Sequence, residues 1–203
     1  MLTPVASTAT HTSLDSGVPV RRPQLVSSGT LGMMIFVVTE VMLFAGMISA
    51  FMIVRTTAVG AWPPPDQPRL PVGETLINTA ALLVSGVFLF LAQRAYYRGD
   101  LVRFRVLLRT TMGLGAFFVL FQGAEWIALL YQGLTLTSST HGSFFYMIVG
   151  THAAHAIAAL ALLGRVYLHH ARGTLASGSV GGAAVLWYFV VIMWPFLYAR
   201  VYL

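Results

Sequence analysis

The chain contains no cysteine and no lysine among its 203 residues. Without cysteine it forms no disulfide, no thiolate metal site and no cysteine nucleophile. Charged residues are also scarce: they make up 9% of the chain, whereas 57% of the residues are hydrophobic. Soluble domains carry about 25% charged residues. The composition therefore predicts a protein that lies largely within a lipid bilayer.

Five apolar segments predict an all-α membrane protein, a bundle of five transmembrane helices. A helix that crosses a bilayer needs about 20 predominantly apolar residues. We place the spans at about residues 31–54, 76–92, 110–131, 144–163 and 180–201. A rigid Trp-Pro-Pro-Pro loop at residues 62–65 separates the first two spans, and Gly181 and Gly182 are expected to fray the start of the last.

The five spans leave no room for a separate soluble domain. Residues 1–29 are rich in Ser, Thr and Pro and hold no apolar run long enough for the core of a signal peptide. We expect a flexible extramembrane tail over residues 1–29 and a membrane domain over residues 30–203.

The arginines predict the orientation of the bundle. If the chain crosses the membrane at each span, nine arginines fall on one side and three on the other. The positive-inside rule then predicts a cytoplasmic N-terminus and an external C-terminus. The largest group, Arg94, Arg98, Arg103 and Arg105, is expected in the loop between the second and third spans. These arginines are also candidates for binding lipid headgroups, and their place in loops argues against nucleic acid as a partner.

Four ionisable side chains fall inside the predicted spans: Glu40, Glu125, His152 and His155. Such groups are costly in hydrocarbon and normally face a partner or a cavity. At about 1.5 Å of rise per residue, Glu40 lies roughly 14 Å from the cytoplasmic edge, at about the depth of the two histidines. We therefore expect Glu40 to hydrogen-bond one of these histidines across the first and fourth spans, with Glu125 closer to the outer face.

The two histidines are three residues apart, so they project from one helical face. That spacing would suit a metal, but carboxylate-metal bundles place a Glu three residues before a His, and neither Glu40 nor Glu125 has such a companion. We expect a polar network with no metal and no catalytic residue. The tryptophans Trp62, Trp126 and Trp187 are expected to be interfacial anchors.

Short motifs occur in order along the predicted spans. They are Thr-Glu-Val-Met-Leu-Phe-Ala-Gly at 39–46, Trp-Pro-Pro at 62–64, Leu-Ile-Asn-Thr at 76–79, Gln-Gly-Ala-Glu-Trp at 122–126, His-Gly-Ser-Phe-Phe at 141–145 and Gly-Thr-His-Ala-Ala-His at 150–155. This order resembles subunit III of the haem-copper oxidases, the cytochrome c and quinol oxidase family. The length resembles bacterial five-span forms that lack the first two helices of the seven-span type.

The last span departs from the pattern of that family. The family's Tyr-Trp-His-Phe-hydrophobic-Asp is Leu-Trp-Tyr-Phe-Val-Val here, so Tyr188 stands at the His position and Val191 at the Asp position. Ala153 also replaces a glycine between the two histidines. The departures suggest a divergent branch, in which Tyr188 is a candidate member of the polar network.

The resemblance implies a subunit without its own redox centre in a bacterial cytoplasmic membrane. Its partners would be oxidase subunits I and II, with haem and copper in the catalytic partner and phospholipid bound in a cleft between its own helices. It would support oxygen reduction and proton translocation. The residues agree on one point, because two membrane histidines are too few to ligate the several haem and copper centres of a catalytic subunit.

Three other interpretations remain open from the sequence. One is a subunit III-like partner of nitric oxide reductase. Another is a small proton-coupled transporter that uses Glu40 and Glu125, although no internal repeat supports it. The last is a free-standing scaffold or lipid-binding protein.

Overall fold

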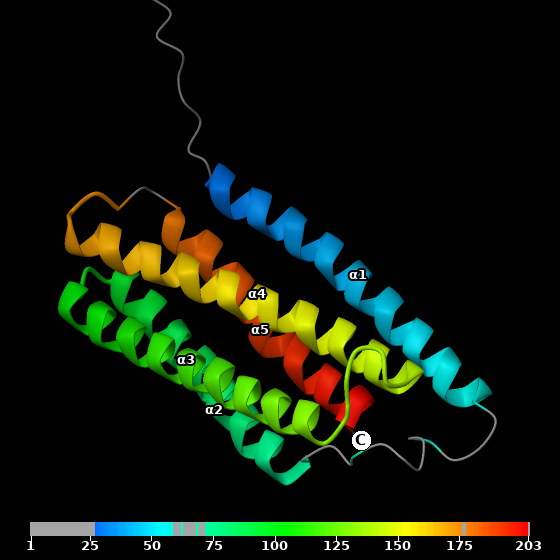
Figure 1. Cartoon of the computed structure of the whole chain (residues 1–203). Helices are drawn as coiled ribbons and strands as arrows, with labels where there is room; N and C mark the ends of the chain where they lie inside the picture. The colour runs from blue at the N-terminus through cyan, green and yellow to red at the C-terminus, as the bar shows by residue number, and fades with distance from the viewer. Residues whose placement is uncertain (1–26, 59–61, 63–67, 69–71, 176–177, 203) are drawn as a thin grey trace, which may run out of the picture.

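The computed structural model describes residues 27–58, 62, 68, 72–175 and 178–202. These residues form α1 (Ser28–Thr57), α2 (Val72–Tyr97), α3 (Leu101–Tyr131), α4 (Thr140–Ala171), α5 (Ser179–Leu197) and a π-helical turn η1 (Tyr198–Tyr202). Five helical segments, the last continuing through Tyr202, are long and apolar enough to cross a membrane. They lie side by side as an elongated bundle (Figure 1). The five-helix class is therefore confirmed, and α1 begins at Ser28, inside the segment expected to be a tail.

The helices are longer than the predicted spans, most clearly where α2 meets α3. Only residues 98–100 separate the two helices. Gly99 has a positive φ of 79°, which favours glycine, and the Asp100 side chain accepts a hydrogen bond from the Arg103 N–H at 3.0 Å, which caps α3. The prediction of a long arginine-bearing loop is wrong, because Arg94 lies in the last turn of α2 and Arg103 and Arg105 lie in α3.

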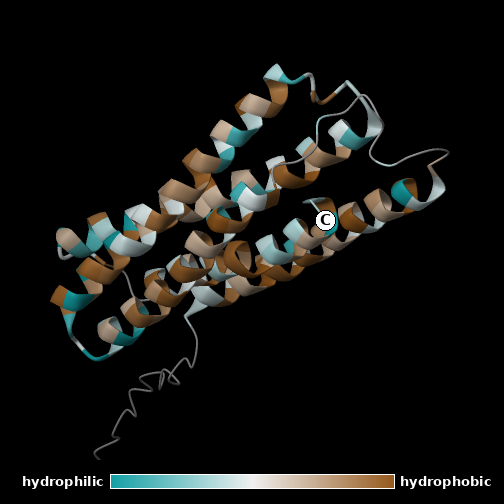
Figure 2. Ribbon diagram, turned by 90° about the horizontal axis from the view of Figure 1, so that it is seen from below, coloured by the Kyte–Doolittle hydropathy of each residue, from teal (hydrophilic) through white to brown (hydrophobic). Residues whose placement is uncertain are grey.

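The fifth helix is the centre of the bundle. It packs against α1, α2 and α4, whereas α1 touches mainly α5 and, to a smaller extent, α4. Figure 1 shows α1 along one edge of the bundle. Apolar residues run through the helical bodies and hydrophilic residues collect mostly near the helix ends (Figure 2). This distribution is the one a bilayer requires of a helical membrane protein.

Two tryptophans on α5 are hydrogen-bonded to a polar stripe on α2. Trp187 Nε1 donates to Ser85 Oγ at 3.2 Å, and Trp194 Nε1 donates to Thr79 Oγ1 at 2.8 Å. Both indoles are fully buried. The prediction that Trp187 is an interfacial anchor is therefore wrong: its N–H has found a partner inside the bundle, where water is absent.

The start of α5 is packed, not frayed. The helix begins at Ser179, before Gly181 and Gly182, and Thr30 Oγ1 of α1 donates to the carbonyl of Gly178 at 3.2 Å. A Cβ on Gly181 would collide with Thr30, since the two helices cross closely there. Small residues at such a crossing let the backbones approach.

A single glycine on α3 makes room for Trp187. A Cβ on Gly115 would collide with the indole and with Leu160, whereas a Cβ on Gly113, two residues earlier, would meet nothing within 4 Å. We predict that Gly115→Ala lowers the free energy of unfolding by about 1–3 kcal/mol, because overpacking forces neighbouring side chains and backbone to shift.

The matched control is Gly113→Ala, which should be neutral or slightly stabilising because alanine favours helix. Thermal unfolding midpoints of the two variants in the same detergent test this prediction. Equal midpoints would contradict the described packing of Trp187 on α3.

Candidate functional site

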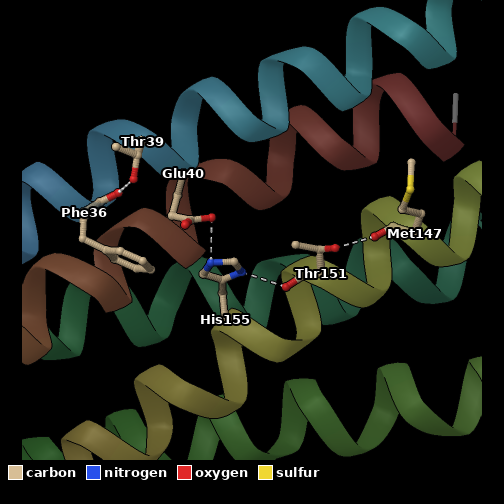
Figure 3. Close-up of polar contacts among 6 residues, drawn as sticks. All are labelled: Phe36, Thr39, Glu40, Met147, Thr151 and His155. Carbon is tan, nitrogen blue, oxygen red and sulfur yellow. Dashed lines mark hydrogen bonds and ion pairs between the residues drawn. The ribbon is translucent and has the colours of Figure 1, made fainter.

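The structure brings Glu40 of α1 and His155 of α4 into contact. Figure 3 shows the two side chains pointing toward each other, with 3.0 Å between His155 Nε2 and Glu40 Oε2. The other ring nitrogen, Nδ1, lies 2.8 Å from the backbone carbonyl oxygen of Thr151, one turn earlier on α4. The side chains are 14% and 15% exposed, so both are largely enclosed.

The contacts of His155 orient its ring between two helices. A backbone carbonyl only accepts, so Nδ1 holds a hydrogen and donates to Thr151. Nε2 then faces the Glu40 carboxyl at 3.0 Å, which gives that group a partner inside the bundle. An ionisable group within a membrane span normally faces such a partner.

Aromatic rings surround His155. Its ring centroid lies 6.3 Å from that of Phe36, 5.7 Å from that of Phe44 and 5.7 Å from that of Phe189. These rings come from α1 and α5, so the imidazole lies at the junction of three helices. The contact gives α1 its polar attachment to α4.

His152 does not join this pair. It is 1% exposed, and neither of its ring nitrogens has a hydrogen-bond partner among the described residues. Its ring lies 5.0 Å from Trp194, 6.2 Å from Phe44 and 6.4 Å from Phe118, measured between centroids. Phe44 touches both histidines, and it is the only ring contact that they share within the described segments.

Glu125 belongs to a second polar cluster, between α2 and α3. The hydroxyl of Thr75 lies 3.2 Å and 3.1 Å from its two carboxylate oxygens, and Gln122 Nε2 donates to Oε2 at 2.8 Å. Asn78 Nδ2 donates to Gln122 Oε1 at 3.4 Å and to the carbonyl of Phe118 at 3.3 Å. All of these groups are buried. The position of Glu125 along its span predicted a place nearer the outer face. In the structure Glu125 lies in the last two turns of α3.

The end of the chain closes this second cluster. Gln122 Nε2 also donates to the hydroxyl of Tyr202 at 3.0 Å. Tyr202 lies in the π-helical turn η1, which begins three residues after Pro195. Its ring also packs against Phe145 of α4, with 5.6 Å between centroids. The cluster thus connects α2, α3 and the end of α5.

Tyr188 makes a third, separate contact. Its hydroxyl donates to Gln93 Oε1 of α2 at 2.6 Å. Val191, at the position where the resemblance expects Asp, packs against Gly86 of α2, where a Cβ would lie 3.0 Å from Val191 Cγ1. The five residues predicted as one network therefore lie in separate places, and only Glu40 and His155 touch each other.

The predicted interface residues differ in their surroundings. Trp62 is half-buried and packs edge-on against His141, with 5.3 Å between ring centroids, and against Phe51 at 5.9 Å. Trp126 packs against Tyr146 at 6.1 Å. The arginines Arg94, Arg98, Arg103 and Arg105 are exposed. The prolines predicted to follow Trp62 lie outside the described residues.

Sequence reasoning missed most partners of Glu125 and of the tryptophans. The missed side chains are Thr75, Asn78, Thr79 and Ser85 on α2 together with Gln122 and Tyr202. A signal existed on α2, because its small polar residues recur at spacings of three, four and six or seven. Such a polar stripe on an otherwise apolar helix marks the face that turns toward other helices.

The ionisable side chains that the structure describes within the bundle lie apart from one another, except for Glu40 and His155. Within the described segments no three His, Asp or Glu side chains come together. His155 is occupied by Glu40 and Thr151, and His152 is enclosed by aromatic rings. These side chains therefore make contacts that join one helix to another.

Comparison with known proteins identifies the family. Residues 17–203 match the family model for cytochrome c oxidase subunit III. The chain belongs to this family. It is thus a subunit III of a terminal oxidase, and the comparisons do not favour the nitric oxide reductase or transporter alternatives.

Named relatives of this subunit III agree with the match. The chain is 32% identical to a probable cytochrome c oxidase subunit 3 of Nocardia farcinica and 34% identical to one of Mycobacterium leprae, in each case over 90% of both chains. It is also 32% identical to cytochrome c oxidase subunit 3 of Lemur catta, over 84% of this chain and 64% of that protein.

The Glu40 and His155 contact makes a prediction about variants. Glu40→Gln should change stability by less than about 0.5 kcal/mol, because an amide N–H donates to a neutral Nε2. Glu40→Leu should cost about 1–2 kcal/mol, because it leaves Nε2 without a partner in hydrocarbon. Thermal unfolding midpoints in detergent measure both.

Thr39→Val is the matched control, since the Thr39 hydroxyl donates only to the carbonyl of Phe36 on its own helix. It should leave the midpoint unchanged. If Glu40→Gln were as damaging as Glu40→Leu, a hydrogen bond alone would not account for the contact.

The second cluster predicts coupling between Gln122 and Tyr202. Gln122→Leu should cost about 1–3 kcal/mol, because Glu125 and Tyr202 both lose a donor. Tyr202→Phe should cost about 0.5–1 kcal/mol. In the double variant the Tyr202→Phe effect should vanish, since its donor is already gone. Additive effects in chemical unfolding would contradict the bond, and exposed Gln132→Leu serves as the control.

Proposed function

We propose that this subunit III packs within the membrane against oxidase subunits I and II, which hold the haem and copper, and that it has no redox centre of its own. The observation that carries the proposal is the family match across residues 17–203. The internal geometry is consistent with it, since the buried polar side chains are engaged with each other or with aromatic rings. The relatives are named for cytochrome c oxidase, which makes cytochrome c our proposed electron donor.

The role that fits these cross-helix contacts is to stabilise the complex during oxygen reduction and proton translocation. Cross-helix hydrogen bonds hold α5 to α2 and α3, and the Glu40 to His155 contact holds α1 to α4. A partner subunit would then meet a bundle of fixed shape. Rigid surfaces bind with a smaller loss of conformational entropy.

We propose that the N-terminus is cytoplasmic and the C-terminus external, in a bacterial cytoplasmic membrane. Among the described residues, seven arginines lie toward the end that holds the α2–α3 and α4–α5 turns, and Arg55 and Arg200 lie toward the other. Loops rich in arginine remain on the cytoplasmic side during insertion. Two of the relatives come from the bacteria Nocardia farcinica and Mycobacterium leprae, which supports the choice of membrane.

We also propose that a phospholipid binds between α1, α4 and α5. A hollow of about 410 Å³ lies there, at the arginine-rich end. Apolar side chains such as Met33 and Leu162 line it together with Arg165 and His169. That combination suits a lipid whose phosphate faces the cation and whose chain follows the apolar wall.

The assignment is tested by purifying the chain from its native membranes in mild detergent through an affinity tag. We expect haem absorption, copper and two further subunits to elute with it in fixed ratio. The haem should be lost when the purified complex is dissociated and this subunit is isolated again. Absorption spectra, metal analysis and mass spectrometry provide the three measurements.

Two results would overturn the proposal. One is a pure, folded chain that carries no haem protein through purification from membranes grown under aerobic conditions. The other is haem that stays with the isolated subunit. A mock purification from cells with the untagged protein controls for haem proteins that bind the resin.

A further inference from the structure

The turn between α2 and α3 carries two adjoining hollows. One, of about 230 Å³, is lined by Leu91, Arg94, Ala95, Arg98, Asp100 and Arg103. The other, of about 490 Å³, is lined by Phe90, Gln93, Arg94, Tyr97 and Arg98. Arg94 and Arg98 line both, so the two hollows adjoin at these side chains.

The charges around these hollows are not balanced within the described residues. Arg94, Arg98 and Arg103 supply three positive charges, and their guanidinium groups make no ion pair or hydrogen bond with any described residue. Asp100 supplies one negative charge, and its Oδ1 accepts the backbone N–H of Arg103. The excess of two positive charges favours an anion.

The arrangement of polar and apolar groups points to a lipid anion. Arg94 and Arg98 lie in the last turn of α2 and just beyond it, where a membrane helix reaches the headgroup layer. Phe90 lies one turn further into the helix and is 56% exposed, and Tyr97 is 71% exposed. A phosphate beside the guanidinium groups would thus have an aromatic and aliphatic surface directly below it, on the membrane side.

Gln93 adds a neutral donor to the larger hollow. Its Oε1 accepts the hydroxyl of Tyr188 at 2.6 Å, which fixes the amide so that oxygen faces α5. The Nε2 group makes no hydrogen bond with any other residue that the structure describes. Tyr188 stands where the last helix departs from the family pattern, so this divergence lies next to the arginine hollows.

We propose that Arg94, Arg98 and Arg103 bind the headgroup phosphate of an anionic phospholipid, with its acyl chains along Phe90 and Leu91. Guanidinium groups bind phosphate oxygens through paired N–H donors. Tyr188 is a positioning residue: it holds Gln93, whose amide supplies a further donor. The site requires only that these helices span the membrane, and it does not depend on the oxidase assignment.

The test uses the full chain in mild detergent, together with any subunits that accompany it. Native mass spectrometry counts dioleoyl phosphatidylglycerol retained at increasing lipid concentration, with dioleoyl phosphatidylcholine as the zwitterionic comparison. We expect retention of the anionic lipid and at least tenfold weaker retention of the zwitterionic one. Each of Arg94→Ala and Arg98→Ala should weaken retention about fivefold, the factor that corresponds to about 1 kcal/mol per arginine.

Arg105→Ala is the matched control. It removes the same charge from the same end of α3, two residues from Arg103, but Arg105 lines neither hollow. It should leave retention unchanged. Arg94→Lys with Arg98→Lys should restore only part of the retention, because lysine keeps the charge but lacks the paired N–H donors. Tyr188→Phe should weaken retention about twofold by releasing Gln93. Unchanged elution on size exclusion shows that each variant is folded.

Four results would overturn the site. A loss of retention in Arg105→Ala equal to that in Arg94→Ala would show unspecific attraction to positive charge. Displacement of the lipid by inorganic phosphate at the same concentration would show a soluble anion site. Equal retention of both lipids would show that the site does not select an anionic headgroup. A cross-link from Arg94 or Arg98 variants to an acidic segment of another subunit would show a protein contact. Haem content in the same samples reports separately on the oxidase assignment.

Discussion

The absence of water inside the bilayer is the constraint on which this structure depends. Helices satisfy their own backbone groups there, but a polar side chain must find its partner on a neighbouring helix. Trp187, Trp194 and Gln122 each do so. Because apolar faces gain little by leaving lipid for one another, these few bonds and the close contact at Gly115 specify how the helices are rotated.

Helix count and depth could be read from the sequence, but rotation could not. Counting residues along a span gives the height of a side chain, and equal height correctly predicted that Glu40 meets one of the two histidines, which is His155. The direction in which a side chain points depends on which helices are neighbours. For that reason the partners of Glu125 and the burial of Trp187 were missed, although the polar stripe on α2 indicated its inner face. The arginines were predicted in a loop because each span was limited to its apolar run, whereas α2 and α3 continue past those runs and carry most of the arginines on their ends.

The polar groups form separate units with different partners. The Glu40 and His155 pair joins two helices through a carboxyl facing an imidazole, and the Glu125 cluster joins three elements through neutral donors. The last helix contributes to the second cluster through Tyr202 and to a third contact through Tyr188. The divergent sequence of the last helix therefore does not remove its polar contacts with other helices. Tyr188 makes one of them at the His position of the family pattern. Membership of the subunit III family and an unusual final helix are compatible for this reason.

The position of α1 has a consequence for synthesis in the cell. Its partners are α5 and α4, and the bond from Thr30 to Gly178 joins residues 148 apart in the chain. At about 5–20 residues per second, roughly 7 to 30 s pass between the emergence of the two ends of that bond. Until His155 on α4 emerges, the first helix faces lipid or the insertion machinery with Glu40 still unpartnered. An insertion factor that shelters a lone carboxyl in a nascent helix would have its substrate here, and the bundle closes only when the last helix arrives.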